Sequence, residues 1–431
     1  MSENVALELP RIFRVRQTFD RPRVADIPAT IAAEFDQLSL SATVRPGQTV
    51  AITAGSRGIA NIATIVRGIV DYVKRLGAIP FIVPAMGSHG GGNAAGQLGI
   101  LADYGITPES MGCEFRASMD TVIVSQAAEG FDVHFDQYAY NADHTIVCGR
   151  VKPHTEMTGD IQSGLMKMLL IGLGKHNGAK IYHRAIHDYD FARIVRSVSG
   201  EVLQKCRIAA GLAIIENGYD ETAFIRAVHP QDFEQSEITH LKLATAHLPR
   251  LPFKTADVLI VDEIGKNISG TGMDTNIIGR KYNDHAAVEH EWPKVRRIIV
   301  RSLTPESHGN ASGIGIAEFC KSRAIRQMDK KITWINALTS GHTSCVMDPL
   351  HFETDRELLE ICLPTIGLTE PPNARLLWIK NTLHLDEVEC SAAYWDEAQT
   401  RNDLEILTEP RELPLDDSGN LPDFTFTGPG H

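Results

Sequence analysis

The chain has 431 residues, of which 43% are hydrophobic and 22% are charged, a globular composition that excludes disordered, collagen-like and coiled-coil chains. With 54 acidic and 42 basic residues the net charge is −12, so neither a general nucleic-acid surface nor an anionic-membrane surface is expected. The seven cysteines form no C-x-x-C pair, and the sequence shows neither a signal-peptide pattern nor an apolar run of about 18 residues. These features predict a reduced, cytoplasmic protein.

In chain order, strand and helix patterns alternate as they do in parallel α/β sheets. A helix pattern at 24–38 precedes a βαβ unit, with strands at 49–53 and 79–83 and a helix at 59–76 between them. A polar, proline-containing linker at 246–253 then separates two alternating sets. The remaining expected strands are a hairpin at 121–124 and 131–135, followed by 145–148, 208–215, 256–261, 297–300, 332–337 and 374–379.

These patterns predict an α/β protein of two domains with mainly parallel sheets and an active-site cleft between the domains. The N-terminal domain is expected over 1–250 and the C-terminal domain over 251–431. The tail beyond residue 408 is rich in proline, glycine and aspartate, so we expect it to be irregular.

Unusual polar residues follow three of the predicted strands. Arg57 lies in a glycine-containing turn, His89 in the turn Gly87-Ser88-His89, and His154 after Pro153. Ligands bind outside the carboxyl ends of strands in open parallel sheets. Arg57 suits a substrate carboxylate, and two histidines suit acid–base catalysis on opposite faces of one carbon, as in a racemase or epimerase. The alternatives are an exposed turn at Arg57, a phosphate-binding loop at His89 and a structural histidine at His154.

Further segments carry residues of chemical interest. His183 and His187 have the spacing of metal ligands on one helix face, or of exposed surface histidines, without the H-E-x-x-H motif. The glycine-rich segment 172–180 matches neither the Walker nor the dinucleotide-binding pattern. Asp262 and Glu263 begin a polar loop that suits a cation, sugar hydroxyls or plain solvent exposure. Two cationic residues follow that loop, Arg280 and Lys281.

Over most of residues 45–400, the chain resembles the nickel-dependent lactate racemase family and its related 2-hydroxyacid racemases and epimerases. The resemblance rests on the turns of Arg57 and His89, on Pro153-His154, and on the stretch Gly164-Leu-Met-Lys167. The spacing between Lys167 and His183 is the most specific part of the match. The resemblance implies two α/β domains that enclose the active site.

It also implies a cofactor, the nickel-pincer nucleotide, which is a pyridinium-3,5-bisthiocarboxylic acid mononucleotide carrying nickel. Lys167 would hold this group covalently, Ser88 and Gly164 would contact it, and His183 would ligate the nickel. In the same comparison, His89 and His154 would be the acid–base residues, and Arg57, Arg280 and Lys281 would bind the substrate.

The expected activity is inversion of the C2 carbon of a 2-hydroxy acid by hydride transfer to this cofactor. Ala54 replaces a usual aspartate of the family, and Ile278-Gly279 replaces an aromatic–Gln pair, which indicates a divergent subgroup with a more polar substrate such as a sugar acid. One alternative is a metal-dependent lyase that acts on sugar acids through Asp262, Glu263 and His183. Another is a ligand- or cofactor-binding protein without turnover. The expected partner is a small hydroxyacid, with no nucleic acid and no membrane.

Overall fold

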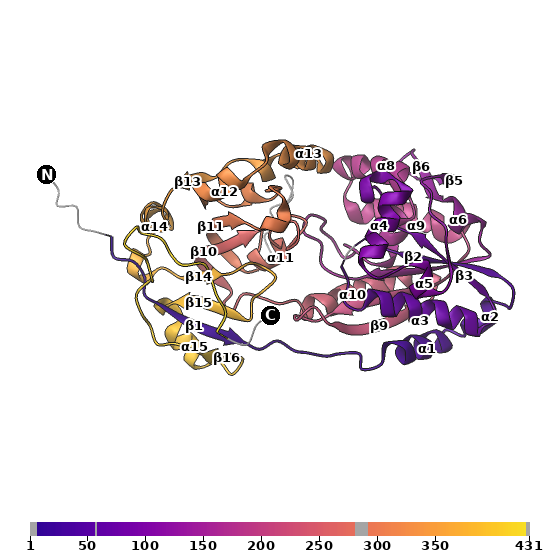
Figure 1. Ribbon diagram of the computed structural model, residues 1–431, viewed down its shortest axis with the longest axis horizontal. Coiled ribbons are helices and arrows are strands. Elements are labelled where there is room, and N and C mark those ends of the chain that lie inside the picture. The colour runs from indigo at the N-terminus through magenta and orange to yellow at the C-terminus, as the bar shows by residue number, and fades with distance from the viewer. Residues whose placement is uncertain (1–6, 57, 281–291, 428–431) are drawn as a thin grey trace. The chain divides into compact units, whose positions relative to one another are not determined.

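Figure 1 shows a computed structural model of the chain, which describes residues 7–56, 58–280 and 292–427 apart from the side chains of 187, 339 and 340. The chain divides into two compact units. The central unit is Asp20–Leu248, and the terminal unit joins Met1–Phe19 to Pro249–His431. Residues 1–19 therefore belong with the C-terminal part of the chain.

The central unit is built on a six-stranded sheet with the order β4-β3-β2-β7-β8-β9. All neighbours in it are parallel except β8 and β9, which are antiparallel. A separate antiparallel hairpin, β5–β6, lies in the same unit. The strands are β2 (Thr49–Ala54), β3 (Ile79–Pro84), β4 (Glu114–Phe115), β5 (Thr121–Gln126), β6 (Asp132–Asp136), β7 (His144–Arg150), β8 (Ile208–Glu216) and β9 (Thr222–Val228).

Helices cover both faces of this sheet, because its buried strands present apolar side chains to both sides. In β2, Val50 and Ile52 face a core shared with α1 and α3, whereas Ala51 faces the core of α8, α9 and α10. The helices are α1 (Ile27–Gln37), α2 (Leu40–Thr43), α3 (Ile62–Arg75), α4 (Ala94–Asp103), α5 (Pro108–Met111), α6 (Gln137–Asn141), α7 (Leu165–Lys167), α8 (Lys175–Asp188), α9 (Phe191–Lys205) and α10 (Phe233–Ala246). A π-helical turn, Met168–Gly172, lies between α7 and α8.

The terminal unit contains an eight-stranded sheet with the order β13-β12-β11-β10-β14-β15-β1-β16. The five strands from β13 to β14 are parallel, and β15, β1 and β16 continue the sheet in antiparallel pairs. Its strands are β1 (Ile12–Gln17), β10 (Thr255–Ile264), β11 (Lys294–Leu303), β12 (Phe319–Lys321), β13 (Leu350–Phe352), β14 (Leu376–Ile379), β15 (Glu387–Ser391) and β16 (Leu404–Ile406). The helices are α11 (Thr275–Ile278), α12 (Ser322–Gln327), α13 (Lys330–Ser340), α14 (Asp355–Cys362) and α15 (Trp395–Gln399).

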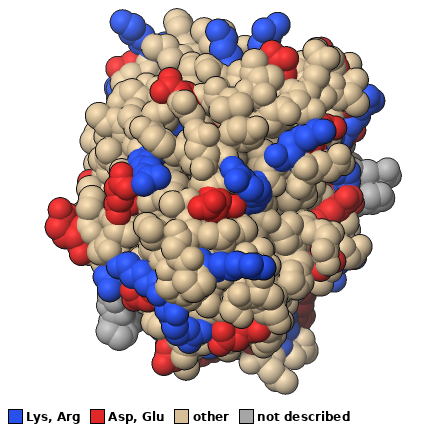
Figure 2. Space-filling model, turned by 90° about the vertical axis from the view of Figure 1, so that its right-hand side faces the viewer, with Lys and Arg blue, Asp and Glu red and all other residues tan. Residues whose placement is uncertain are grey.

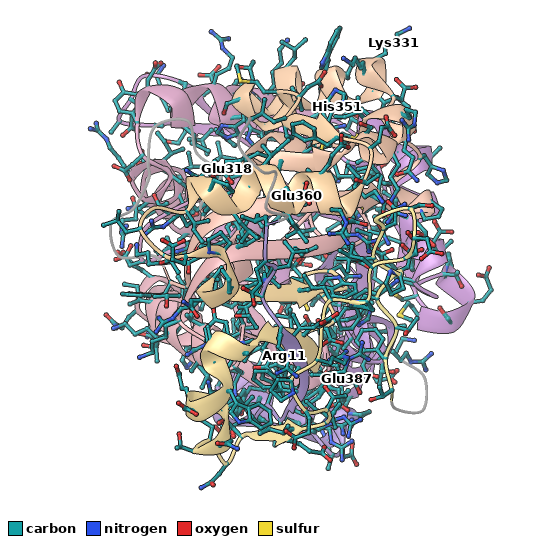
Figure 3. The ribbon with its side chains drawn as sticks, turned by 90° about the vertical axis from the view of Figure 1, so that its left-hand side faces the viewer. Arg11, Glu318, Lys331, His351, Glu360 and Glu387 are labelled. Carbon is teal, nitrogen blue, oxygen red and sulfur yellow. The ribbon has the colours of Figure 1, made fainter. Side chains whose placement is uncertain are left out.

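Buried acidic residues of β15 hold β1 in this sheet. Glu387, labelled in Figure 3, lies within salt-bridge distance of Arg14 and Arg16, and Glu389 accepts a hydrogen bond of 2.9 Å from Arg14. Both carboxylates are about 1% exposed, so their charges require these arginines. The first strand of the chain is therefore an integral part of the terminal unit.

Both sheets are mixed and mainly parallel, which confirms the predicted α/β class. One expected strand is wrong, because residues 332–337 lie within helix α13. Their β-branched and aromatic content favours a strand, but the Asp329 side chain caps the helix by accepting a 3.0 Å hydrogen bond from the Ile332 amide. No helix within the described ranges combines the length and apolarity needed to cross a bilayer.

Candidate functional site

The candidate site is the edge of the central sheet at which β3, β2 and β7 end. These three strands are parallel neighbours with β2 in the middle, so their carboxyl ends share one edge. The chain leaves β2 for β3 on one side and later enters β7 on the other. Such a reversal of strand order opens a crevice in which α/β proteins bind ligands. The carboxyl ends of β3 and β7 are separated by two strand spacings, about 10 Å.

His89 lies in the turn after β3. The first residue of the turn is tied to the neighbouring strand, since the Ala85 amide donates to the Ala54 carbonyl at 2.8 Å. Nδ1 of the exposed His89 ring lies 2.5 Å from Ser56 Oγ, in the turn after β2. Because this contact engages Nδ1, Nε2 is the ring nitrogen through which His89 would exchange a proton. Arg57, the next residue after Ser56, lies outside the described residues.

His154 is half-buried in the segment after β7, and the backbone fixes its ring. Nδ1 accepts hydrogen bonds from the amides of Glu156 and Met157, each at 3.1 Å. The His154 amide itself donates to Gln162 Oε1 at 2.9 Å. A nitrogen that accepts two N–H donors carries no proton, so the neutral ring is protonated on Nε2.

Lys167 is the last residue of α7, and its half-buried side chain places Nζ 6.0 Å from the centre of the Phe191 ring. Asp160, which precedes this turn in the chain, lies 2.7 Å from Arg196. Gly164 precedes the helix with φ of +92°, and a Cβ there would lie 2.2 Å from a carboxylate oxygen of Glu237. Glycine is therefore required in order to bring the Lys167 turn onto this acid.

Sequence reasoning missed Glu237, which lies beneath the Lys167 turn. One of its carboxylate oxygens accepts a 2.8 Å hydrogen bond from the Leu165 amide, while the other has no hydrogen-bond partner among the described atoms. Burial raises the pKa of Glu237 to about 8, against the lowering effect of backbone hydrogen bonds from Leu165 and Met166. A sequence signal exists, because Glu237 falls on the apolar stripe of α10 formed by Phe233 and Leu241.

His183 is exposed on α8, in the same interrupted helical segment that carries Lys167. The side chain of His187, its expected partner, lies outside the described ones. Among the described residues, no three histidine, cysteine, aspartate or glutamate side chains converge to hold a metal. An imidazole nitrogen such as that of His183 is a suitable donor for nickel.

The polar loop expected at Asp262 and Glu263 is instead the end of β10. Asp262 is 3% exposed, and its carboxylate accepts hydrogen bonds from Arg301 and Trp378, each at 2.6 Å, and from the Phe424 amide. Burial raises the pKa of Asp262, and Arg301 opposes this shift. The strand β10 extends three residues beyond its predicted end at residue 261. Asp262 is therefore a buried structural charge rather than a ligand for a cation.

Arg280, expected to bind substrate, uses four of its five N–H donors within the terminal unit. Nη1 donates to Glu318 and to the Ile316 carbonyl, and Nη2 donates to the carbonyls of Val295 and Arg296, at 2.8–3.0 Å. Glu318 is labelled in Figure 3. Through these bonds Arg280 stabilises the terminal unit. Its Nε–H is the one donor that takes no part in them. Lys281 lies outside the described residues.

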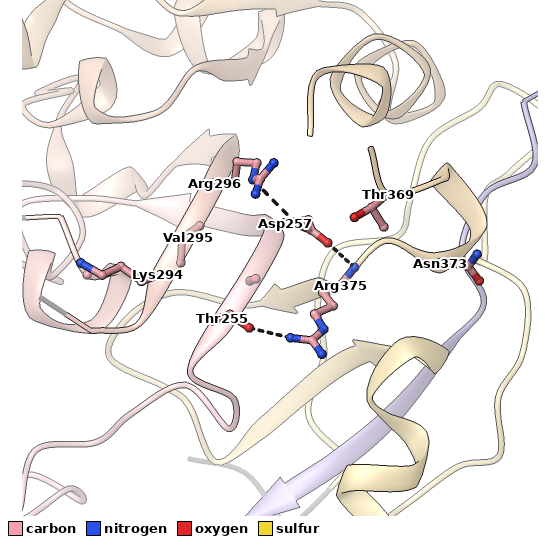
Figure 4. A pocket seen from close by; sticks show the side chains of 10 residues that line it. Thr255, Asp257, Lys294, Val295, Arg296, Thr369, Asn373 and Arg375 are labelled. Carbon is pink, nitrogen blue, oxygen red and sulfur yellow. Dashed lines mark hydrogen bonds and ion pairs between the residues drawn. The ribbon is translucent and has the colours of Figure 1, made fainter. Parts of the chain in front are cut away.

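The terminal unit contains a cavity of about 630 Å³ (Figure 4). It opens at the edge of the terminal sheet where β10, β11 and β14 begin. Arg296 and Arg375 line it beside Asp257, which accepts a 3.0 Å hydrogen bond from the Arg375 amide. The Arg375 guanidinium donates to Thr255 at 2.9 Å. None of the predicted site residues that the structure describes lines this cavity.

Charges of both signs are interspersed on the face of the molecule that Figure 2 shows. Lysine and arginine side chains do not gather into one stripe on that face.

Two mixed, mainly parallel sheets define an α/β protein, a class in which ligands bind at the carboxyl edge where the strand order reverses. The fold is that of lactate racemase. The chain aligns with the structure of the lactate racemase apoprotein from Thermoanaerobacterium thermosaccharolyticum with a TM-score of 0.52 at 12% sequence identity, covering 86% of this chain and 98% of that chain. No protein-family model and no curated protein matches the sequence. The predicted resemblance is confirmed at the level of the fold, in a divergent chain.

Proposed function

We propose that this protein is a 2-hydroxyacid racemase or epimerase, which inverts the C2 carbon of a small hydroxyacid. One observation carries the proposal: His89 and His154 follow β3 and β7, on either side of β2 at one sheet edge. Two strand spacings separate the ends of these two strands by about 10 Å, which is the scale of a small molecule. The likeness in fold to a lactate racemase supports the same class of reaction.

The two imidazoles differ in the hydrogen bonds of their Nδ1 atoms, and this gives them different roles in proton transfer. Ser56 Oγ can donate to Nδ1 of His89 or accept from it, so His89 keeps this hydrogen bond in either tautomer and can take up a proton at Nε2. His154 carries its proton on Nε2 and presents a donor to a substrate oxygen. His89 is thus the base for one enantiomer. For the other enantiomer the roles exchange, which requires a proton on His154 Nδ1 and therefore a rearrangement that moves the Glu156 and Met157 amides away from that nitrogen.

The substrate carboxylate is assigned to Arg57. This residue comes three positions after the end of β2 in the sequence, and a guanidinium binds a carboxylate through two parallel hydrogen bonds. Arg280 is not used in this assignment, because its donors already bind the terminal unit.

The donor chemistry of the central unit fits a nickel-pincer nucleotide. Lys167 would hold it through its amine, His183 would ligate the nickel, and the Ser88 hydroxyl and the Gly164 backbone would contact it. When bound, this group supplies a hydride acceptor, while the protein supplies binding, orientation and proton transfer.

Co-expression with the enzymes that make the pincer nucleotide tests the proposal. Intact mass should show an increment on Lys167 and metal analysis about one nickel per chain, and the protein should racemise a 2-hydroxyacid from a panel that includes sugar acids. Lys167→Arg should lose the increment, whereas Lys180→Arg, a change of an exposed lysine on α8, should keep it. Protein that carries nickel on Lys167 but leaves every hydroxyacid enantiomerically pure would contradict the proposed activity.

A further inference from the structure

An ion pair without solvent contact lies beneath the His89 turn. Lys175 and Asp136 are both 0% exposed, and Lys175 Nζ is 2.8 Å from Asp136 Oδ2. Lys175 Nζ also donates to the carbonyl of Pro84, the last residue of β3, at 2.5 Å. Burying two charges costs free energy that an apolar pair would not cost. Stability alone therefore does not explain why this ion pair is present.

The backbone is distorted where this lysine stands. Lys175 has φ of +54°, a left-handed conformation that is unfavourable for residues with a Cβ. Lys175 is the third residue after the π-helical turn Met168–Gly172 and the first residue of α8. The helical segment from α7 to α8 is therefore interrupted at this point. The interruption turns the Lys175 side chain into the interior, toward the end of β3.

The His89 turn and this interrupted helix also touch backbone to backbone. The Gly87 amide lies 3.4 Å from the Gly172 carbonyl oxygen. A Cβ at Gly172 would be 2.9 Å from the Ala85 carbonyl oxygen, and a Cβ at Gly87 would be 2.9 Å from the Ile171 side chain. The two segments therefore pack at a distance that only glycine allows.

We propose that Lys175 is a positioning residue that locks the His89 turn to the helix bearing Lys167 before the interruption and His183 after it. The lock acts through the Pro84 carbonyl, five residues before His89. Asp136 anchors the lysine, and Asp136 is itself held at the start of α6, where it accepts a 2.8 Å hydrogen bond from the Ala139 amide. The catalytic meaning of the lock rests on the proposed function, but the lock itself does not.

The double variant Lys175→Met/Asp136→Asn tests the proposal. It removes both charges, keeps similar side-chain volumes and leaves an amide oxygen to accept from Ala139. Because neutral replacement of a whole buried pair is often tolerated, the melting temperature should stay within a few degrees of the wild type. We expect faster amide hydrogen exchange in residues 85–92, and at least a tenfold lower kcat in the cofactor-loaded protein. Lys180→Met removes an exposed lysine of the same helix and should change neither quantity.

Unchanged exchange in 85–92 together with unchanged kcat would overturn the proposal. Should the double variant not fold, Gly172→Ala decides, because its Cβ pushes the Ala85 carbonyl away without altering any charge. Gly172→Ala should likewise raise exchange in 85–92, and normal exchange and turnover would overturn the lock. Faster exchange in a protein whose wild type racemises nothing would support the lock and reject the proposed function.

Discussion

The carboxyl of Glu237 is buried, and no cationic side chain among the described residues pairs with it, so its protonation should make the stability of the protein depend on pH. Its folded pKa of about 8 exceeds the ordinary value of 4.5, so between these pH values the folded protein keeps a proton that the unfolded chain has released. The free energy of unfolding should therefore fall as pH rises from 4.5 to 8, by at most about 1.4 kcal/mol per pH unit from this group. Glu237→Gln should remove this decline. Urea unfolding at pH 5 and pH 8 measures it, and parallel losses in both proteins would contradict the assignment.

Gly164 makes the same contact testable from the opposite side. Gly164→Ala introduces a Cβ 2.2 Å from the Glu237 carboxylate at a φ of +92°, so we expect a loss of about 2 to 4 kcal/mol in unfolding free energy. Gly200→Ala is the matched control. Gly200 lies in α9 with no atom within 4 Å of its added Cβ, and the change should stabilise by about 0.5 to 1 kcal/mol. Equal effects of the two substitutions on the denaturation midpoint would refute the close contact.

At the scale of elements, much of the fold could be predicted from periodicity. Buried strands such as β2 and β7 are short apolar runs that end in small or polar residues, and the signal is strong because both faces of the sheet are covered. The signal failed at α13, because its large apolar residues Trp334 and Leu338 are exposed and its buried face is formed by the small residues Thr333 and Ala337. It also failed at Asp262, because a buried carboxylate satisfied by Arg301 looks in sequence like the start of a polar loop.

The C-terminal segment was expected to be irregular, and its lack of regular structure hides a structural role. Phe424 is 2% exposed and meets Trp378 edge-on at 5.5 Å between ring centres, while the Leu421 carbonyl accepts from buried Arg301 at 2.6 Å. Phe424→Ala should therefore cost about 3 to 5 kcal/mol in unfolding free energy. Leu368→Ala, at a fully exposed leucine, should change it by less than about 0.5 kcal/mol. Thermal or urea unfolding compares them, and a silent Phe424→Ala would show that the segment is not part of the core.

At the scale of the whole molecule, sequence patterns do not reveal which distant strands pair with one another. The pairing of β1 with β15 joins residues more than 370 positions apart. The sequence pattern of each strand predicts a strand but does not indicate which other strand it pairs with. The candidate site shows the same limit. His89 and His154 could be selected because each follows a strand, but their common edge depends on β2 lying between β3 and β7. Lys175 and Asp136 could not be selected, because only the fold brings their charges together.

The central claim is that the carboxyl edge of β3, β2 and β7 inverts a 2-hydroxyacid with two histidines. The most direct measurement is chiral analysis of hydroxyacid turnover by cofactor-loaded wild type, His89→Ala, His154→Ala and His229→Ala. His229 follows β9, which runs antiparallel, so it lies at the opposite sheet edge and serves as the control. We predict at least about a 100-fold loss of kcat for each of the first two variants, in correctly folded protein, and normal turnover for the third. Near-normal racemisation in His89→Ala or His154→Ala would contradict the account.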